Sequence, residues 1–174
     1  MREKTPLKRM TAASVFAALI AVLSQLAIPT PSSVPLTLQT FAVVLAGACL
    51  GPLWGAISAA VYLALGVLGA PVFAGFGGGV GALVSYTGGF LLSFPLVAAL
   101  SGAAATRKKA SGIPLALTGT LVCHLLGVLW YSVVGQVRLL AAFTAVSLPY
   151  LGKDVLFTLG ALYLAGVLKR RGIF

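Results

Sequence analysis

Long apolar runs, separated by short polar or glycine-rich breaks, fill most of the chain. A helix needs about 20 apolar residues, within a range of roughly 17 to 25, to cross the hydrocarbon core of a membrane. The run from Leu36 to Leu68 is longer than this and is interrupted by Gly51-Pro52, a pair that favours a turn between two short helices. The pattern therefore predicts six transmembrane helices, at residues 10–28, 37–50, 53–68, 88–105, 113–134 and 148–168.

The composition points to the same class of protein. Hydrophobic residues make up 60% of the 174 residues, charged residues make up 8%, and the mean hydropathy is +1.09. Such a chain has too little polar surface to cover a soluble globule, so we predict one all-α integral membrane domain over residues 1–174. The run at 10–28 is long and lacks a small-residue cleavage site, which favours a retained helix over a signal peptide.

Basic residues gather at three places along the chain. Most of the twelve Lys and Arg lie at residues 2–9, 107–109 and 169–171, between or beside the hydrophobic runs. The net charge of +10 therefore indicates membrane topology rather than nucleic-acid binding. Because cytoplasmic loops are enriched in Lys and Arg, six spans place all three clusters and both termini in the cytoplasm, whereas five spans would send two clusters outside.

The opposite, outer side collects irregular backbone. It holds the Pro-rich segment 29–35, the Gly-rich segment 69–79 and the segment 85–89. Irregular backbone at membrane depth is tolerated only where it is buried in protein or lines a wet cavity. This side is therefore predicted to hold a small-molecule pocket, with ordinary loops as the alternative, since loops are also rich in Gly and Pro.

Asp154 is the only carboxylate inside the apolar part of the chain, since the other acid, Glu3, belongs to the amino-terminal cluster. A carboxylate near hydrocarbon is costly unless it faces a cavity, meets a cation or accepts hydrogen bonds. An intramembrane acid is therefore interpreted first as part of a ligand or ion site. The structural alternative is that Asp154 caps the last helix or pairs with Arg138 or Lys153.

Four strings of residues carry a resemblance to a known family. They are Val34-Pro35-Leu36-Thr37-Leu38-Gln39-Thr40, the segment 69–79, Thr87-Gly88-Gly89-Phe90-Leu91-Leu92-Ser93-Phe94-Pro95 and Leu148-Pro149-Tyr150-Leu151-Gly152-Lys153-Asp154. In this order and spacing they resemble the BioY family over nearly the whole chain. Two positions depart from the common pattern, because Tyr86 stands where many members have Pro and Phe157 where many carry a Lys. The chain also contains no Asn, so no Asn amide can contact a ligand.

The resemblance implies the biotin-specific substrate-binding (S) component of an energy-coupling factor (ECF) transporter, in the cell membrane of a prokaryote. Such a subunit binds extracellular biotin and delivers it inward with a membrane coupling subunit and ATP-binding cassette ATPases. The sequence has no Walker motif, so ATP would be bound by the partners, and neither enzymatic activity nor a cofactor is expected. A homo-oligomer, an S-component for a different vitamin and a non-transport membrane scaffold stay open.

Biotin would offer a ureido ring, an apolar bicycle and a carboxylate tail. Asp154 is expected to accept hydrogen bonds from the ureido N–H groups. Lys153 or Arg138 would meet the ligand carboxylate, with Lys153 favoured, and the alternative for both is snorkelling toward lipid headgroups. Adjacent helical residues point about 100° apart, so Lys153 and Asp154 are expected not to face each other.

Further polar and aromatic residues are expected to complete the pocket. The candidates are Thr37, Gln39, Ser85, Tyr86, Thr87, Phe73, Gly75, Phe76, Trp130 and Tyr150. Helix capping is the alternative for Thr37 and Thr87. Aromatic side chains near an interface often anchor a protein in the membrane, which is the alternative for Trp130 and Tyr150.

Two further features complete the expectations. Ala13, Ala17 and Ala21 recur every four residues and form a smooth strip, which the resemblance suggests as a partner-binding surface and which ordinary helix packing also explains. His124 is expected to be a packing residue, since one His makes no metal site, and no metal is predicted.

Overall fold

The computed structural model of the chain describes residues 6–173. Its elements run in the order α1 (Pro6–Ser24), β1 (Ala27–Ile28), β2 (Leu36–Thr37), α2 (Gln39–Leu50), α3 (Pro52–Val67), the 3-10 turn η1 (Ala74–Phe76), α4 (Gly81–Val84), α5 (Gly88–Ala104), α6 (Lys109–Gly135), α7 (Leu139–Val146) and α8 (Leu148–Arg170). Three helices, α1, α6 and α8, are long and apolar enough to cross a membrane. The apolar helices α2, α3 and α5 are shorter.

Each of the six predicted ranges overlaps one of these helices, and the differences lie at their ends. Helix α1 stops at Ser24 rather than at residue 28, because residues 27–28 instead form an antiparallel pair with Leu36–Thr37. Helix α2 meets α3 at Gly51, whose φ of 87° suits glycine and whose successor, Pro52, occupies the first turn of α3.

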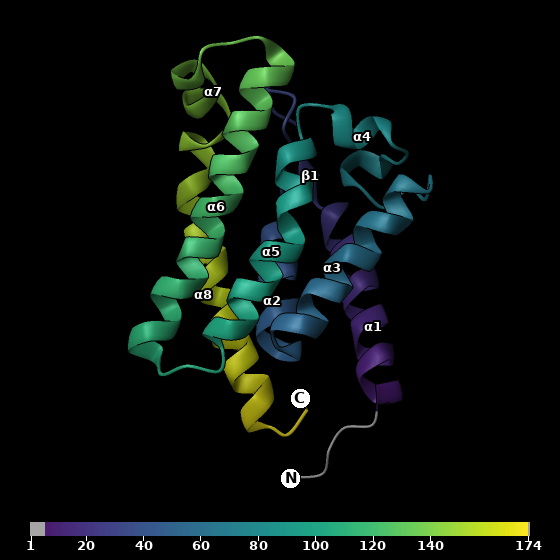
Figure 1. Ribbon diagram of the computed structural model, residues 1–174, viewed down its shortest axis with the longest axis vertical. Coiled ribbons are helices and arrows are strands. Elements are labelled where there is room, and N and C mark those ends of the chain that lie inside the picture. The colour runs from purple at the N-terminus through teal and green to yellow at the C-terminus, as the bar shows by residue number, and fades with distance from the viewer. Residues whose placement is uncertain (1–5, 174) are drawn as a thin grey trace.

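Three short elements were predicted only as loop. Helix α7 forms from an eight-residue apolar run between the helices predicted at 113–134 and 148–168, and α4 and η1 lie between those predicted at 53–68 and 88–105. Runs this short do not show a helical period clearly enough to be separated from an apolar loop. All three short elements lie around one end of the bundle (Figure 1).

Helix α2 forms the centre of the bundle. Its residues Ala42, Val43 and Val44 have no exposed surface, and it packs against α1, α3, α5 and α8. Helix α5 in turn packs against α3 and α6, and α6, α7 and α8 lie together on the other flank (Figure 1). Large apolar side chains such as Leu68, Leu140 and Leu156 stay exposed on the outer helices, as expected for a surface that faces lipid.

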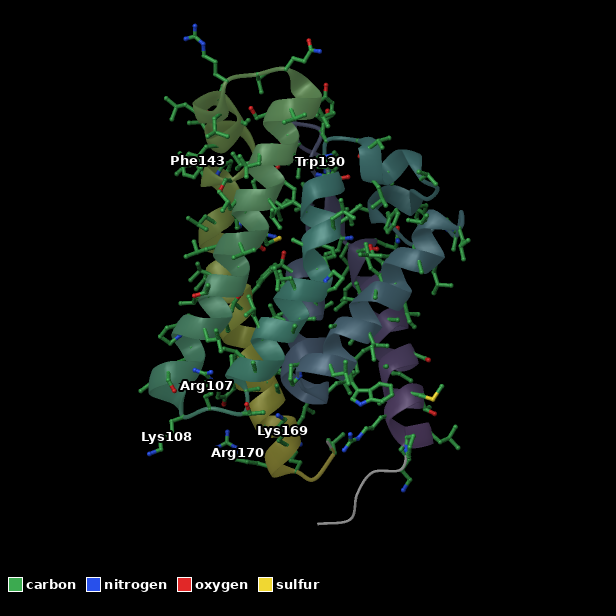
Figure 2. All side chains as sticks on the ribbon, in the orientation of Figure 1. Arg107, Lys108, Trp130, Phe143, Lys169 and Arg170 are labelled. Atoms are coloured by element: carbon green, nitrogen blue, oxygen red, sulfur yellow. The ribbon has the colours of Figure 1, made fainter. Side chains whose placement is uncertain are left out.

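The two ends of the bundle differ in charge. The start of α1 and the end of α8 lie at the same end of the molecule (Figure 1). Arg107, Lys108, Lys169 and Arg170 project from that end, whereas Trp130 lies near the opposite one (Figure 2). The basic clusters at 107–109 and 169–171 therefore share one end, and the part of the first cluster at residues 2–5 lies outside the described residues.

Candidate ligand-binding pocket

A cavity of about 370 Å³ lies at the end of the bundle opposite the basic residues. Its volume falls in the range of about 300–1,000 Å³ that is typical of small-molecule sites. Its walls come from the segment 33–40, the segment 73–77, residues 82–94 and the start of α8. The polar, charged and aromatic side chains in its lining include Thr37, Gln39, Phe73, Ser85, Tyr86, Thr87, Phe90, Phe94, Tyr150, Lys153 and Asp154.

One wall of the cavity is the segment 69–80, which Gln25 ties to the end of α1. The Gln25 side-chain amide donates to the carbonyl oxygens of Val72 (3.2 Å) and Phe73 (3.1 Å), and its oxygen accepts from the backbone N–H of Phe76 (2.9 Å). The segment also contains three glycines with positive φ, at residues 69, 75 and 79. Phe73, which lines the cavity, is thereby held with its ring edge-on to Tyr62 at a centroid distance of 5.5 Å.

A second wall is the segment 30–37, which Tyr150 fixes to α8. The Tyr150 hydroxyl donates to the carbonyl oxygen of Val34 and lies 2.8 Å from the Thr30 hydroxyl. Tyr150 is 6% exposed and lines the cavity. It therefore does not lie at an exposed membrane interface, which was the alternative for this residue.

Asp154 lies at the base of the cavity and is 6% exposed. Its Oδ1 atom is 2.7 Å from the ammonium nitrogen of Lys153, and its Oδ2 atom is 3.2 Å from Nε2 of His124. The prediction that Lys153 and Asp154 cannot meet is therefore wrong, because the long Lys side chain can curl back although the two Cα–Cβ bonds diverge. The contact is an ion pair without hydrogen-bond geometry, so Oδ1 has no hydrogen-bonding partner.

Lys153 is held by two further groups. Its ammonium donates to the carbonyl oxygen of Thr37 at 2.9 Å and lies over the ring of Phe157, 5.0 Å from the centroid. A cation over an aromatic face is stabilised by the ring quadrupole. Phe157 thus stabilises the cation that this chain carries at residue 153.

Gln39 and Thr37 continue the polar row from the start of α2. The Thr37 hydroxyl donates to Oε1 of Gln39 at 3.1 Å, and the Gln39 amide donates to the hydroxyl of Tyr62 at 2.6 Å. The Thr37 hydroxyl also accepts from the backbone N–H of Gln39 at 3.3 Å, whereas the N-cap residue of α2 is Leu38 and makes no side-chain capping hydrogen bond. Both side chains are buried and line the cavity.

Ser85, Tyr86 and Thr87 form the wall that precedes α5. The hydroxyls of Ser85 and Thr87 are 3.0 Å apart, and Thr87 stands at the helix N-cap position without a capping hydrogen bond from its side chain. Trp130 donates from Nε1 to the carbonyl oxygen of Ser85 at 3.0 Å. Trp130 therefore braces this wall from behind and is not among the cavity-lining residues.

Three other candidates also lie outside the lining of the cavity. Arg138 precedes α7 and is exposed, so it does not join Lys153 at the site. Gly75 lies beside the lining residue Ala74, and Phe76 is 71% exposed. Arg138, Gly75, Phe76 and Trp130 are therefore not among the residues that line this cavity, and their contact with a ligand stays a prediction.

The alanine strip of α1 also differs from its expectation. Ala13 and Ala17 are 3% and 2% exposed, and Ala21 is half-buried against the core. Helix α1 packs on α2 and α3, so these alanines lie within the bundle, which is the ordinary-packing alternative. The exposed positions of α1 include Ser14, Val15 and Ala18 instead.

Two residues at the site were missed by sequence reasoning. His124, assigned to packing, contacts Asp154, and its other ring nitrogen lies 3.0 Å from the hydroxyl of Ser147. His124 and Asp154 are 30 residues apart in the sequence, so no local pattern connects them. Among residues 6–173 no group of three or more His, Cys, Asp or Glu side chains that could hold a metal ion occurs.

The fold and the cavity define a class of protein, a helical protein with apolar helices long enough to cross a membrane and a cavity of a size typical of small-molecule sites. A solved structure of the same architecture is described as the S-component for biotin from an ECF-type ABC transporter. It superposes with a TM-score of 0.87 at 25% sequence identity, over 98% of this chain and 95% of that one.

Sequence comparisons lead to one family. The model of the BioY family matches residues 1–172. A probable biotin transporter BioY of Pyrococcus horikoshii is 37% identical over 158 residues, which is 91% of this chain and 94% of that protein. The biotin transporter BioY of Rhodobacter capsulatus is 36% identical over 85% of this chain and 86% of that protein. The chain belongs to the BioY family.

Proposed function

We propose that this protein captures biotin from outside the cell and hands it inward as the membrane-embedded substrate subunit of an ECF-type transporter. The observation that carries the proposal is a single buried carboxylate, Asp154, in the lining of a cavity whose other walls are mainly apolar. The relatives named biotin transporters and the structural neighbour described as a biotin S-component support the choice of ligand.

The polar row at the base matches a cyclic urea. Asp154 accepts hydrogen bonds from the two ureido N–H groups, using lone pairs that neither Lys153 nor His124 occupies. Lys153 and Gln39 supply donors for the ligand oxygens. The pairing of Lys153 with Asp154 leaves no net charge from these two residues, so neither charge is buried alone.

The apolar part of the ligand meets the aromatic walls. Phe73, Phe90, Phe94 and Tyr150 line the cavity and suit the fused rings of biotin. The flexible tail would then extend toward the Gly-rich segment 73–77 and the hydroxyls of Ser85 and Thr87. Burial of the fused rings contributes affinity, while hydrogen bonds to Asp154, Lys153 and Gln39 determine the specificity for one vitamin over another.

The six helices are proposed to cross the membrane with both ends of the chain in the cytoplasm. The placement of both described basic clusters at one end of the bundle supports this orientation through the positive-inside rule. Helices α2, α3 and α5 are short for a full crossing, so tilt or local thinning of the bilayer accompanies them. The cavity then opens toward the outside.

Transport requires partners, since no ATP-binding motif occurs in the sequence. We propose a membrane coupling subunit and two ATP-binding cassette ATPases, in line with the description of the structural neighbour as part of an ECF-type ABC transporter. The exposed face of α1, with Ser14, Val15 and Ala18, is the surface of this helix that remains free for a membrane partner.

Equilibrium binding to the purified full-length protein tests the proposal. Biotin is expected to bind, and lipoate, thiamine and riboflavin to bind far more weakly. Asp154→Ala is expected to weaken biotin binding at least tenfold, because a hydrogen bond to a charged group contributes about 1.5–3 kcal/mol. Thr106→Ala, at an exposed position outside the bundle's cavity, is the control.

Two results would contradict the proposal in different ways. Tighter binding of another vitamin would keep the transporter subunit and replace its substrate. Binding of no vitamin, together with failure to co-purify with tagged ATPase subunits, would favour a non-transport membrane scaffold.

A further inference from the structure

Asp154 belongs to a longer row of buried groups that extends away from the cavity. His124 of α6 and Ser147 at the start of α8 stand behind the carboxylate, and they are 5% and 1% exposed. The distances along the row are 3.2 Å from Oδ2 of Asp154 to Nε2 of His124 and 3.0 Å from Nδ1 of His124 to the Ser147 hydroxyl. Neither His124 nor Ser147 lines the ligand cavity.

The direction of hydrogen bonding in this row follows from its charges. A carboxylate oxygen only accepts, so Nε2 of His124 must carry a hydrogen. Lys153 already neutralises Asp154, and an imidazolium here would leave a net positive charge buried in the bundle. A neutral ring with its hydrogen on Nε2 is the form in which Nδ1 can accept a hydrogen bond from the Ser147 hydroxyl.

We infer that His124 is a positioning residue that fixes the Asp154 carboxylate for ligand binding. Ser147 holds the His124 imidazole in the tautomer that donates to Asp154. With Lys153 at Oδ1 and His124 at Oδ2, the carboxylate is held from two sides and cannot rotate freely. Each oxygen still has a lone pair for the ligand. A carboxylate fixed in advance loses less conformational freedom when the ligand binds.

The surroundings support this role. The ring of Phe90, which lines the cavity, meets the imidazole edge-on at a centroid distance of 6.1 Å and so separates His124 from the ligand space. Ser147 is the N-cap residue of α8 but makes no capping hydrogen bond with its side chain. Among the described residues, the Ser147 hydroxyl forms its side-chain hydrogen bond with His124.

The row resembles the order of groups in a serine hydrolase, but its geometry differs. In that catalytic triad the serine meets Nε2 of the histidine and the aspartate meets Nδ1. Here the two nitrogens are exchanged, and Ser147 lies on the side of His124 that faces away from the cavity. The arrangement suits the fixing of a carboxylate, and Ser147 is not among the residues that line the cavity.

A first experiment measures the protonation of the His124 imidazole by NMR in the absence of ligand. Its signals are unambiguous because His124 is the only histidine in the chain. The full-length protein labelled with 15N-histidine, in lipid nanodiscs, is expected to show a neutral imidazole with its hydrogen on Nε2. Ser147→Ala is expected to shift the Nδ1 signal. Thr120→Val, which removes a buried 2.7 Å contact with Thr158 between the same two helices, is expected to leave both signals in place.

A second experiment reads the consequence for binding, and this part rests on the proposed function. His124→Leu is expected to weaken biotin binding about tenfold or more, and His124→Gln, which keeps a donor, to restore part of the loss. Ser147→Ala is expected to weaken binding several-fold, and Thr120→Val to leave it unchanged. Biotin affinity of His124→Leu equal to that of the unmodified protein would overturn the inference.

The two experiments separate the inference from the proposed function. Failure of the unmodified protein to bind biotin, with the Nε2–H tautomer and its dependence on Ser147 intact, would overturn the ligand and keep the fixed carboxylate. A hydrogen on Nδ1, or a spectrum that Ser147→Ala does not change, would overturn the inference whatever the ligand.

Discussion

The interactions of Asp154 show what a single residue type can and cannot predict. A lone acid within apolar sequence indicated a site, and the structure places it at the base of the cavity. Its partners did not follow from the sequence, because the position of the Lys153 ammonium depends on the carbonyl oxygen of Thr37, which is 116 residues away in the sequence. The contact between His124 and Asp154 could not be predicted either, because it forms only when α6 packs against α8.

The choice between the two candidate cations can be tested by a pair of substitutions. Lys153→Met is expected to destabilise the protein by about 3 kcal/mol, because Asp154 would lose its buried partner, and to weaken biotin binding about tenfold. Arg138→Gln is expected to change neither quantity, since Arg138 is exposed and away from the cavity. Thermal unfolding and calorimetric titration of both variants measure these effects.

The opposite ranking of the two variants would contradict the assignment. A larger loss of biotin affinity for Arg138→Gln than for Lys153→Met would identify Arg138 as the cation that meets the ligand, with the loop before α7 folding over the cavity.

At the scale of elements, the long helices follow from hydrophobic run length, and the short ones depend on tertiary contacts. Gly51-Pro52 correctly indicated the turn between α2 and α3. The irregular segment 69–80 was expected to line a pocket, but its conformation is set by Gln25 at the end of α1, which no local pattern links to it. Contacts between residues about 50 positions apart are invisible to an analysis of neighbouring residues.

Gln25 is expected to control how long the ligand stays bound. Gln25→Leu removes the hydrogen bonds to Val72, Phe73 and Phe76, each worth about 1 kcal/mol, so the segment 69–80 should open more often. Biotin dissociation is expected to become about tenfold faster, with faster amide hydrogen exchange at residues 72–77. Ser14→Ala, on the exposed face of the same helix, is the control.

Unchanged hydrogen exchange in the Gln25→Leu variant would show that this segment keeps its conformation without the side chain. The glycines with positive φ would then be sufficient to define the wall.

At the scale of the whole molecule, charge distribution carries the topology. Basic residues distant in sequence lie at one end of the bundle, and the cavity lies at the other (Figure 2). This separation was predictable, because hydrophobic runs and Lys/Arg clusters are properties of the sequence itself. The polar geometry inside the cavity was not predictable, because it depends on how four separate segments approach one another.

The orientation can be measured with two single cysteines in whole cells. Gln136→Cys, near the cavity end, is expected to react with a membrane-impermeant maleimide added outside, and Thr106→Cys, near the basic end, only after permeabilisation. Both positions are exposed, and the natural Cys49 and Cys123 are buried, which keeps the background low. The reverse pattern would place the cavity in the cytoplasm and contradict uptake from outside.

The central claim is a hydrogen bond between Asp154 and the ureido group of the ligand. Asp154 is the only aspartate in the chain, so 13C-aspartate in the protein and 15N in the ureido ring of biotin give one unambiguous pair for distance measurement by solid-state NMR. The account predicts strong dipolar coupling, with the nitrogen about 2.7–3.2 Å from a carboxylate oxygen. Bound biotin without such coupling would show that another group recognises the ureido ring.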